Sequence, residues 1–186
     1  MVERLTDITA KIDNVEKLEA VVTAIRGIAA ARAQEARSLL VGIESYARVV
    51  AGAIGEALRL APRGADEQIA PDKPGQVLFV AEQGFAGGFS DRIIDAARDD
   101  LAGATVLIVG TRGTAIAGER GIRAEWSTAM ASQVSAVPAV ADRVARALYE
   151  RIRQQGLTRI GLTFARPAIG GGFTVARQWL ACWGEY

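Results

Sequence analysis

A glycine-rich segment between an apolar run and an amphipathic run is the strongest candidate for a chemical site in this sequence. The segment reads AEQGFAGGFS over residues 81–90, and we call residues 83–88 the glycine turn. Glycine-rich turns between a strand and a helix often cradle phosphates, because backbone N–H groups converge there with a helix N-terminus. The first question is therefore whether this turn holds a nucleotide.

The details of the glycine turn do not fit a nucleotide site. The spacing Gly84-x-x-Gly87-Gly88 differs from G-x-G-x-x-G, and no Lys-Ser or Lys-Thr follows Gly88 to reach a phosphate. The second apolar run ends at Gly110, where a ribose-binding acid would be expected. These features favour a tight turn with close packing of a helix on a strand, and they predict no bound cofactor.

Catalytic arrangements are equally incomplete. The chain contains no histidine, so Ser90 has no imidazole to activate it, and the commonest metal ligand is missing. Glu82 and Asp91 form the nearest carboxylate pair, but acids at a helix start ordinarily complement its dipole. The surroundings of Cys182 do not suggest a metal site or an activated thiol. We expect no catalytic, cofactor-binding or metal-binding residues, and a nucleotide-binding α/β enzyme with a helical arm stays open as an alternative.

Composition and charge identify no partner. Half of the residues are hydrophobic but only 6% are aromatic, which favours close-packed helices over a sandwich or barrel. The net charge of +1 gives no field that would attract nucleic acid or anionic lipid. The charged start MVERLTDITAKID does not read as a signal peptide, and we expect no apolar run long enough to span a bilayer. These features predict a soluble intracellular protein.

A long periodic segment precedes the glycine turn. From residue 3 to about residue 60 there is no proline, and apolar residues recur at steps of three and four. This spacing predicts one long helix with an apolar stripe, as in a coiled coil, and such a stripe needs a partner to cover it. We call the stripe the apolar seam: Leu5, Ile8, Ile12, Val15, Leu18, Val22, Ile25, Ala29, Ala33, Ala36, Leu40, Ile43, Val50, Ile54 and Ala57.

The rest of the chain has a different pattern. Pro62-Arg63-Gly64 ends the helix, and a segment rich in proline and glycine follows. Beyond it, strands alternate with helices, which predicts an α/β fold with a small open, mostly parallel, Rossmann-like sheet. The expected strands cover residues 76–81, 104–110, 157–167 and 173–183, and the expected helices 90–102, 112–121 and 137–156, with Ser90 as the cap of the first. The expected organisation is a coiled-coil helix over 1–61, a linker over 62–75 and a globular domain over 76–186.

Two segments of the chain resemble the gamma subunit of F-type ATP synthases, the central rotor stalk, and a third resembles it more weakly. Residues 12–32 resemble the family's N-terminal helix motif, I-x-x-V-x-x-x-x-x-I-T-x-A-M-K-M-V-A-A-A-K. Residues 82–90 resemble its glycine turn, S-D-R-G-L-C-G-G-Y-N, and residues 109–113 resemble V-G-x-K-G. The resemblance extends over nearly the whole chain.

The resemblance implies a non-catalytic rotor subunit of a proton-translocating ATP synthase, whose long helix turns inside the α3β3 ring. Its implied partners are the α and β subunits, the epsilon subunit and the membrane c-ring, with a peripheral position on the cytoplasmic face of the membrane. The glycines of the turn would then serve backbone geometry and close approach. The residues implied to contact partners are Arg26, Ile28, Arg32, Gln83, Gly84, Gly87 and Gly88.

The chain also departs from the family pattern. Gly27 stands where the family has methionine, Glu82 where it has aspartate, and Gln83 where it has arginine. The sequence reaches WLACWGEY at about the point where the family's last strand gives way to a long C-terminal helix, which pairs with the first helix. Two alternatives therefore stay open: a short gamma-like adaptor or assembly protein that does not rotate, and self-association through the apolar seam.

Overall fold

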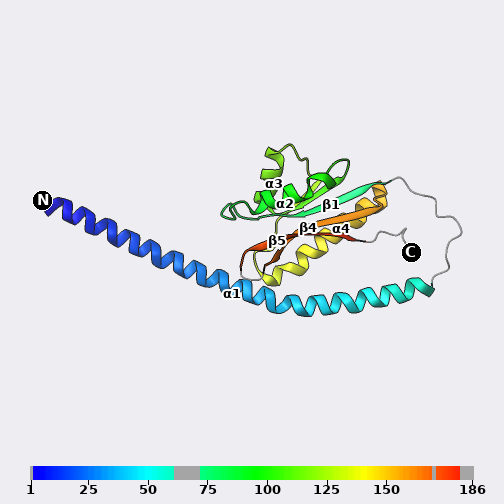
Figure 1. The fold of residues 1–186 in the computed structure, drawn as a ribbon, viewed down its shortest axis with the longest axis horizontal. Helices are drawn as coiled ribbons and strands as arrows, with labels where there is room; N and C mark the ends of the chain where they lie inside the picture. The colour runs from blue at the N-terminus through cyan, green and yellow to red at the C-terminus, as the bar shows by residue number, and fades with distance from the viewer. Residues whose placement is uncertain (1, 61–71, 169–170, 181–186) are drawn as a thin grey trace. The chain divides into compact units, whose positions relative to one another are not determined.

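A computed structural model of the chain describes residues 2–60, 72–168 and 171–180 (Figure 1). The chain divides into two compact units, Met1–Ala61 and Pro62–Tyr186. The first unit is a single helix, and the second is a sheet covered by helices.

The first unit is one helix, α1, which runs over Val2–Leu60 and contains 59 residues. At about 1.5 Å per residue the helix is about 90 Å long, and it confirms the predicted long helix. Ion pairs one turn apart lie on its surface, between Lys17 and Asp13 at 3.2 Å and between Arg59 and Glu56 at 3.3 Å. Exposed pairs of this kind add only about 0.2–0.5 kcal/mol each, so the helix depends mainly on what covers its apolar side.

Glycines within α1 are expected to weaken it without a compensating contact. A Cβ at Gly27 would meet nothing within 4 Å, and Gly27 lies two residues from both Ile25 and Ala29, away from the apolar seam. We expect Gly27→Ala to stabilise the helix by about 0.5–1 kcal/mol, because alanine loses less backbone entropy on folding. Thermal unfolding followed by far-ultraviolet circular dichroism checks this, and an unchanged or lower midpoint would contradict it.

The second unit contains a five-stranded sheet in the order β3-β2-β1-β4-β5. The strands are β1 (Pro74–Phe79), β2 (Thr105–Val109), β3 (Trp126–Thr128), β4 (Arg159–Pro167) and β5 (Phe173–Leu180). The pairs β1–β2, β1–β4 and β2–β3 are parallel, and β4–β5 is antiparallel. The mostly parallel α/β sheet predicted from the sequence is therefore confirmed.

Helices cover both faces of this sheet (Figure 1). They are α2 (Phe89–Ala97), α3 (Thr111–Glu119) and α4 (Val137–Gln155), with short 3-10 turns at Arg98–Asp100 and Val134–Ala136. Successive strand residues point to opposite faces. Val77, Leu107 and Val109 pack with Val140, Val144 and Leu148 of α4, whereas Leu78, Val80 and Ile108 pack with Ile93 and Ile94 of α2 and Ala117 of α3.

Local signals set the ends of α4 as the sequence predicts. A proline lies in its first turn, where the missing N–H has no helical partner to lose. The helix ends at Gly156, which adopts a left-handed φ of 69° and donates its N–H to the Ile152 carbonyl. Glycine is favoured at this position because it has no Cβ to strain.

The sequence prediction missed one strand and misplaced the start of another. Strand β3 has only three residues, Trp126–Thr128, which is too short to show a recognisable period. Strand β1 begins at Pro74, so Pro74 and Gly75 belong to the sheet rather than to the predicted linker. Proline is tolerated there because it is the first residue of the strand.

The predicted capping role of Ser90 is wrong. The N-cap of α2 is Gly88, and no side chain caps this end. Ser90 lies inside the first turn, is only 1% exposed, and its Oγ accepts the N–H of Ala81 at 3.1 Å. Its hydroxyl therefore ties the chain after β1 to α2. Residues 62–71 of the predicted linker, Cys182 and residues 181–183 of the predicted last strand lie outside the described residues.

Candidate functional site

The glycine turn lies on the surface of the second unit, between β1 and α2. All of its residues, 83–88, are exposed, and Phe85 is fully exposed at 101%. A single exposed apolar side chain is common on protein surfaces and by itself marks no contact. The turn holds the predicted contact residues Gln83, Gly84, Gly87 and Gly88 together at the surface, which makes it a candidate contact surface.

The sequence predicted that the glycines of the turn allow close approach within the chain. Among the described residues they do not. A Cβ at Gly84, Gly87 or Gly88 would meet nothing within 4 Å among the described residues. Only Gly87 has a positive φ, of 54°, so only there does the backbone itself favour glycine. The space beside the other two is open, which leaves the backbone of the turn accessible to a partner.

Close approach occurs instead at the glycines of the next turn. A Cβ at Gly113 would lie 2.2 Å from Cγ2 of Val80, and one at Gly110 would lie 2.3 Å from the Val80 carbonyl oxygen. Gly110 also has a φ of 127°. These two glycines let the start of α3 lie directly on the end of β1. The segment 109–113, and not the glycine turn, therefore allows the close packing of a helix on a strand.

Glu82 binds the N-terminus of α3, the helix that follows β2, where free backbone N–H groups could otherwise hold an anion. Its Oε2 accepts the N–H of Thr111 at 2.9 Å and that of Met130 at 2.7 Å, and its Oε1 accepts the Thr111 hydroxyl at 2.8 Å. The N–H of Gly113 is donated to the Ala81 carbonyl at 2.9 Å. Two of the first-turn donors of α3, at Thr111 and Gly113, are thus used by the protein itself.

Acid is expected to weaken the second unit through Glu82. The Thr111 N–H, followed by the Met130 N–H, holds the pKa of this carboxyl below its ordinary value, against an opposing effect of burial. Because the folded pKa is the lower one, the contribution is complete above the unfolded pKa of about 4.3 and is lost as the pH falls through the folded value.

The corresponding experiment compares wild type with Glu82→Gln. We expect wild type to lose about 1 kcal/mol of unfolding free energy through this group as the solution is acidified, as for loss of a helix cap. Glu82→Gln has no carboxyl group to protonate at this position, so its unfolding free energy should fall less on acidification than that of wild type. Urea unfolding at neutral and acid pH measures both, and identical acid sensitivity of the two proteins would contradict the assignment.

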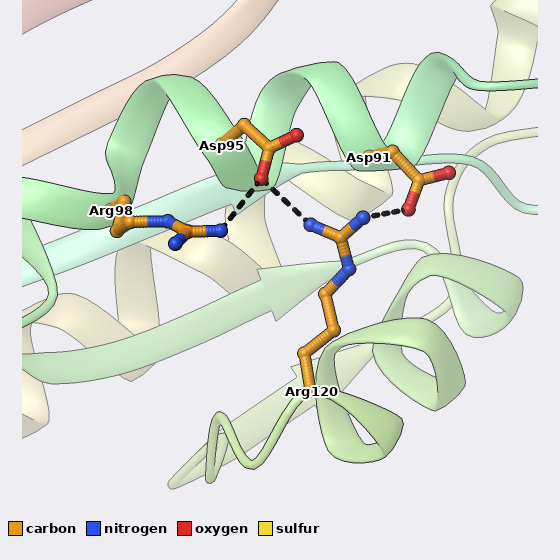
Figure 2. Close-up of polar contacts among 4 residues, drawn as sticks. All are labelled: Asp91, Asp95, Arg98 and Arg120. Carbon is orange, nitrogen blue, oxygen red and sulfur yellow. Dashed lines mark hydrogen bonds and ion pairs between the residues drawn. The ribbon is translucent and has the colours of Figure 1, made fainter.

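A second polar cluster joins α2 to the end of α3 (Figure 2). The guanidinium of Arg120, the residue that ends α3, donates to Asp91 and, at 2.8 Å, to Asp95. Arg98 also donates to Asp95, at 3.1 Å. The hydrogen bond from Arg120, and then that from Arg98, lowers the pKa of the Asp95 carboxyl although the group is well exposed.

The other predicted contact residues, Arg26, Ile28 and Arg32, all lie exposed on α1. Ile28 and Arg32 are four residues apart and share one face of the helix, whereas Arg26 lies on a different face. These residues belong to the first unit, and the glycine turn to the second.

The described part of the apolar seam, from Ile8 to Ala57, is exposed. Its large side chains include Ile12, Leu18, Ile25, Leu40 and Ile54, with exposed fractions between 43% and 62%. Leaving so many apolar groups in water is unfavourable by roughly 25 cal/mol per Å². The seam is therefore the second candidate contact surface.

Helix α1 corrects the expectation that no apolar run could span a bilayer. By length and composition alone, Ile8–Ala57 is long and apolar enough to cross a membrane, with a mean hydropathy of 1.2 over its qualifying window. Glu44 and Arg48 lie inside this stretch, and a charge at the centre of a membrane helix costs about 2.5–3.5 kcal/mol. We interpret the seam as a surface for protein contact.

Within residues 2–60, 72–168 and 171–180, no group of three or more acidic, cysteine or histidine side chains is arranged to hold a metal ion. The residues of the candidate site that sequence reasoning missed are Thr111, Met130 and Arg120. They meet Glu82 and Asp91 across 29 to 48 residues of sequence, and no local pattern signals such contacts.

Comparison with known proteins places this fold in a family. The family described as ATP synthase matches residues 4–178, which include α1, the glycine turn and nearly all of the sheet. The chain therefore belongs to the ATP synthase family, as a member of its F1 gamma group. No curated protein matches it in a sequence search.

A search of solved structures finds chains of ATP synthase assemblies among the matches. The Tetrahymena thermophila mitochondrial ATP synthase central stalk and c-ring is 17% identical, with a TM-score of 0.44, and the match covers 61% of this chain and 51% of that one. A chain of the Euglena gracilis mitochondrial ATP synthase OSCP/F1/c-ring is 13% identical, with a TM-score of 0.46 and coverages of 66% and 41%. A chain of the Euglena gracilis rotor is also 13% identical, with a TM-score of 0.47 and coverages of 77% and 55%. The chain thus spans about half the length of the solved relatives.

Proposed function

We propose that this chain is the central-stalk gamma subunit of a proton-translocating F-type ATP synthase, a non-catalytic rotor that couples rotation to ATP synthesis or hydrolysis in an α3β3 ring. The observation that carries the proposal is the family match over residues 4–178. Helix α1 supports it, because a helix about 90 Å long with an uncovered apolar seam suits a shaft that other chains surround.

The proposal assigns two surfaces to partners. Arg26, Ile28 and Arg32 on α1 would contact the α and β subunits that surround the shaft, and the glycine turn would contact the lower part of the same ring. The open space beside Gly84 and Gly88 and the full exposure of Phe85 support the second assignment. The epsilon subunit and the c-ring complete the proposed partners, and they would hold the protein peripherally on the cytoplasmic face of the membrane.

Native mass spectrometry of the chain mixed with the α and β subunits of the same organism tests the proposal. A rotor must occur once in a ring of three α and three β subunits, because only one shaft fits the axis. We expect a complex with one copy of this chain per ring. A ring that binds three copies of the chain would contradict a rotor and favour an adaptor.

Self-association through the apolar seam is the second candidate, and the exposure of that seam along α1 favours it. A second copy would cover the same side chains that the shaft partners are proposed to cover. Sedimentation over a range of concentrations separates the two. A mass that rises with concentration supports self-association, whereas a monomer with full helicity at every concentration rules it out.

A further inference from the structure

The glycine turn is held at both ends by the same helix, α3. We propose that contacts with α3 hold the glycine turn in the conformation in which it binds its partner. Glu82 and Arg120 are the positioning residues that make these contacts. The inference rests on the proposed role of the turn as a partner contact. It adds to that role a set of contacts within the chain that order the glycine turn before the partner binds.

The first anchor lies immediately before the turn. Glu82 is bound to the N-terminus of α3 through the N–H and hydroxyl of Thr111, and to Met130 through its N–H. The neighbouring Ala81 adds two further contacts: its carbonyl accepts the Gly113 N–H at 2.9 Å, and its N–H is donated to Ser90 at 3.1 Å. The contact with Ser90 closes the base of the loop, and those with Thr111 and Gly113 fix that base on α3. The contact with Met130 ties the base to the segment after β3.

The second anchor lies immediately after the turn. Asp91 stands in the first turn of α2 and is bound by the guanidinium of Arg120, which ends α3 (Figure 2). The same guanidinium reaches Asp95 one turn further along α2, at 2.8 Å. The Arg120 side chain is one-third exposed, so this pair is less screened by water than a fully exposed ion pair. The carboxylates of Glu82 and Asp91, one on each side of the turn, are thus hydrogen-bonded to the two ends of α3.

The turn itself has little else to order it. Among the contacts described, its own backbone bonds run from Phe89 N–H to the Ala86 carbonyl at 3.2 Å and from Arg92 N–H to the Gly88 carbonyl at 3.1 Å. Its side chains are exposed, and Gly84, Gly87 and Gly88 have no packing beside their Cα atoms. A loop rich in glycine loses much entropy when it becomes ordered, and anchors that order it beforehand reduce the cost of binding.

Hydrogen exchange of the full chain tests directly whether the contacts with α3 order the glycine turn. We expect Glu82→Ala and Arg120→Gln to accelerate exchange of the Phe89 and Arg92 amides, which donate to the Ala86 and Gly88 carbonyls of the turn, by about tenfold, the factor that corresponds to about 1.4 kcal/mol of local opening. The matched control is Arg146→Gln, which breaks an exposed ion pair with Asp142 on α4, away from the turn. This control should leave exchange in the turn unchanged. Unchanged exchange in the turn of both test variants, or uniform acceleration over the whole second unit, would overturn the proposal.

Affinity for the α3β3 ring supplies the functional readout. Both test variants should bind the ring about tenfold more weakly, while urea unfolding shows that the second unit stays folded. Faster exchange with undiminished affinity would overturn the positioning role. If the wild-type chain itself does not bind the ring, the proposed function fails, and the exchange experiment still decides whether α3 orders the turn.

Discussion

Gly113→Ala is expected to destabilise the second unit by about 2–3 kcal/mol, because it inserts a methyl group into a packed core. The new Cβ would lie 2.2 Å from Cγ2 and 2.3 Å from Cβ of Val80, and 3.1 Å from Oγ of Ser90. Val80 is only 1% exposed, and its Cβ is fixed to the backbone that follows β1. Rotation of a side chain therefore cannot relieve the clash, and α3 must move away from the sheet.

The matched control lies in the same helix. A Cβ at Gly118 would meet nothing within 4 Å, so Gly118→Ala should stabilise α3 by about 0.5–1 kcal/mol through helix propensity alone. Urea unfolding followed by the fluorescence of Trp126, which packs against the α4 side of the core, measures both variants. Equal midpoints for Gly113→Ala and wild type would show that α3 does not pack on β1 as described.

A charge placed in the apolar seam is expected to prevent assembly, whereas a charge beside the seam is not. Leu40 belongs to the seam, and Val41, one residue further on, points about 100° away from it. Both side chains are exposed in the chain, at 43% and 71% respectively. Leu40→Asp should therefore leave the isolated helix as stable as Val41→Asp does.

The difference should appear when a partner covers the seam. An unpaired carboxylate buried by Leu40→Asp should weaken incorporation into the α3β3 ring by at least about 100-fold, or about 2.7 kcal/mol. Val41→Asp should change it by less than about threefold, because its carboxylate stays in water. The amount of chain retained in ring complexes on gel filtration measures both. Equal losses for the two variants would indicate that the seam is not the covered face.

The sequence predicts the elements that have their own period. Helix α1 has an uninterrupted apolar repeat without proline, and β1 and β2 are continuous apolar runs typical of buried parallel strands. Strand β3, at Trp126–Thr128, is too short to carry such a signal. Ser90 stands where a helix cap is expected, but the tertiary contact with Ala81 determines its position instead.

The site was harder to predict because its contacts are distant in sequence. The glycine turn was recognisable from its composition, but its open glycines and the close approach at Gly110 and Gly113 are consequences of how α3 meets β1. The partners of Glu82 are 29 and 48 residues away, at Thr111 and Met130. Only the fold brings these groups together, so their roles follow from the structure and not from the spacing of residues.

The most direct test of the rotor proposal is to watch the second unit while the ring hydrolyses ATP. A gold particle attached to the exposed Tyr149 position of α4, after its replacement by cysteine and removal of Cys182, reports rotation and leaves the residues of the glycine turn and the apolar seam unaltered. With the α and β subunits immobilised, the rotor account predicts continuous rotation in one direction that requires ATP. A particle that stays fixed on rings that bind the chain and hydrolyse ATP would contradict the account.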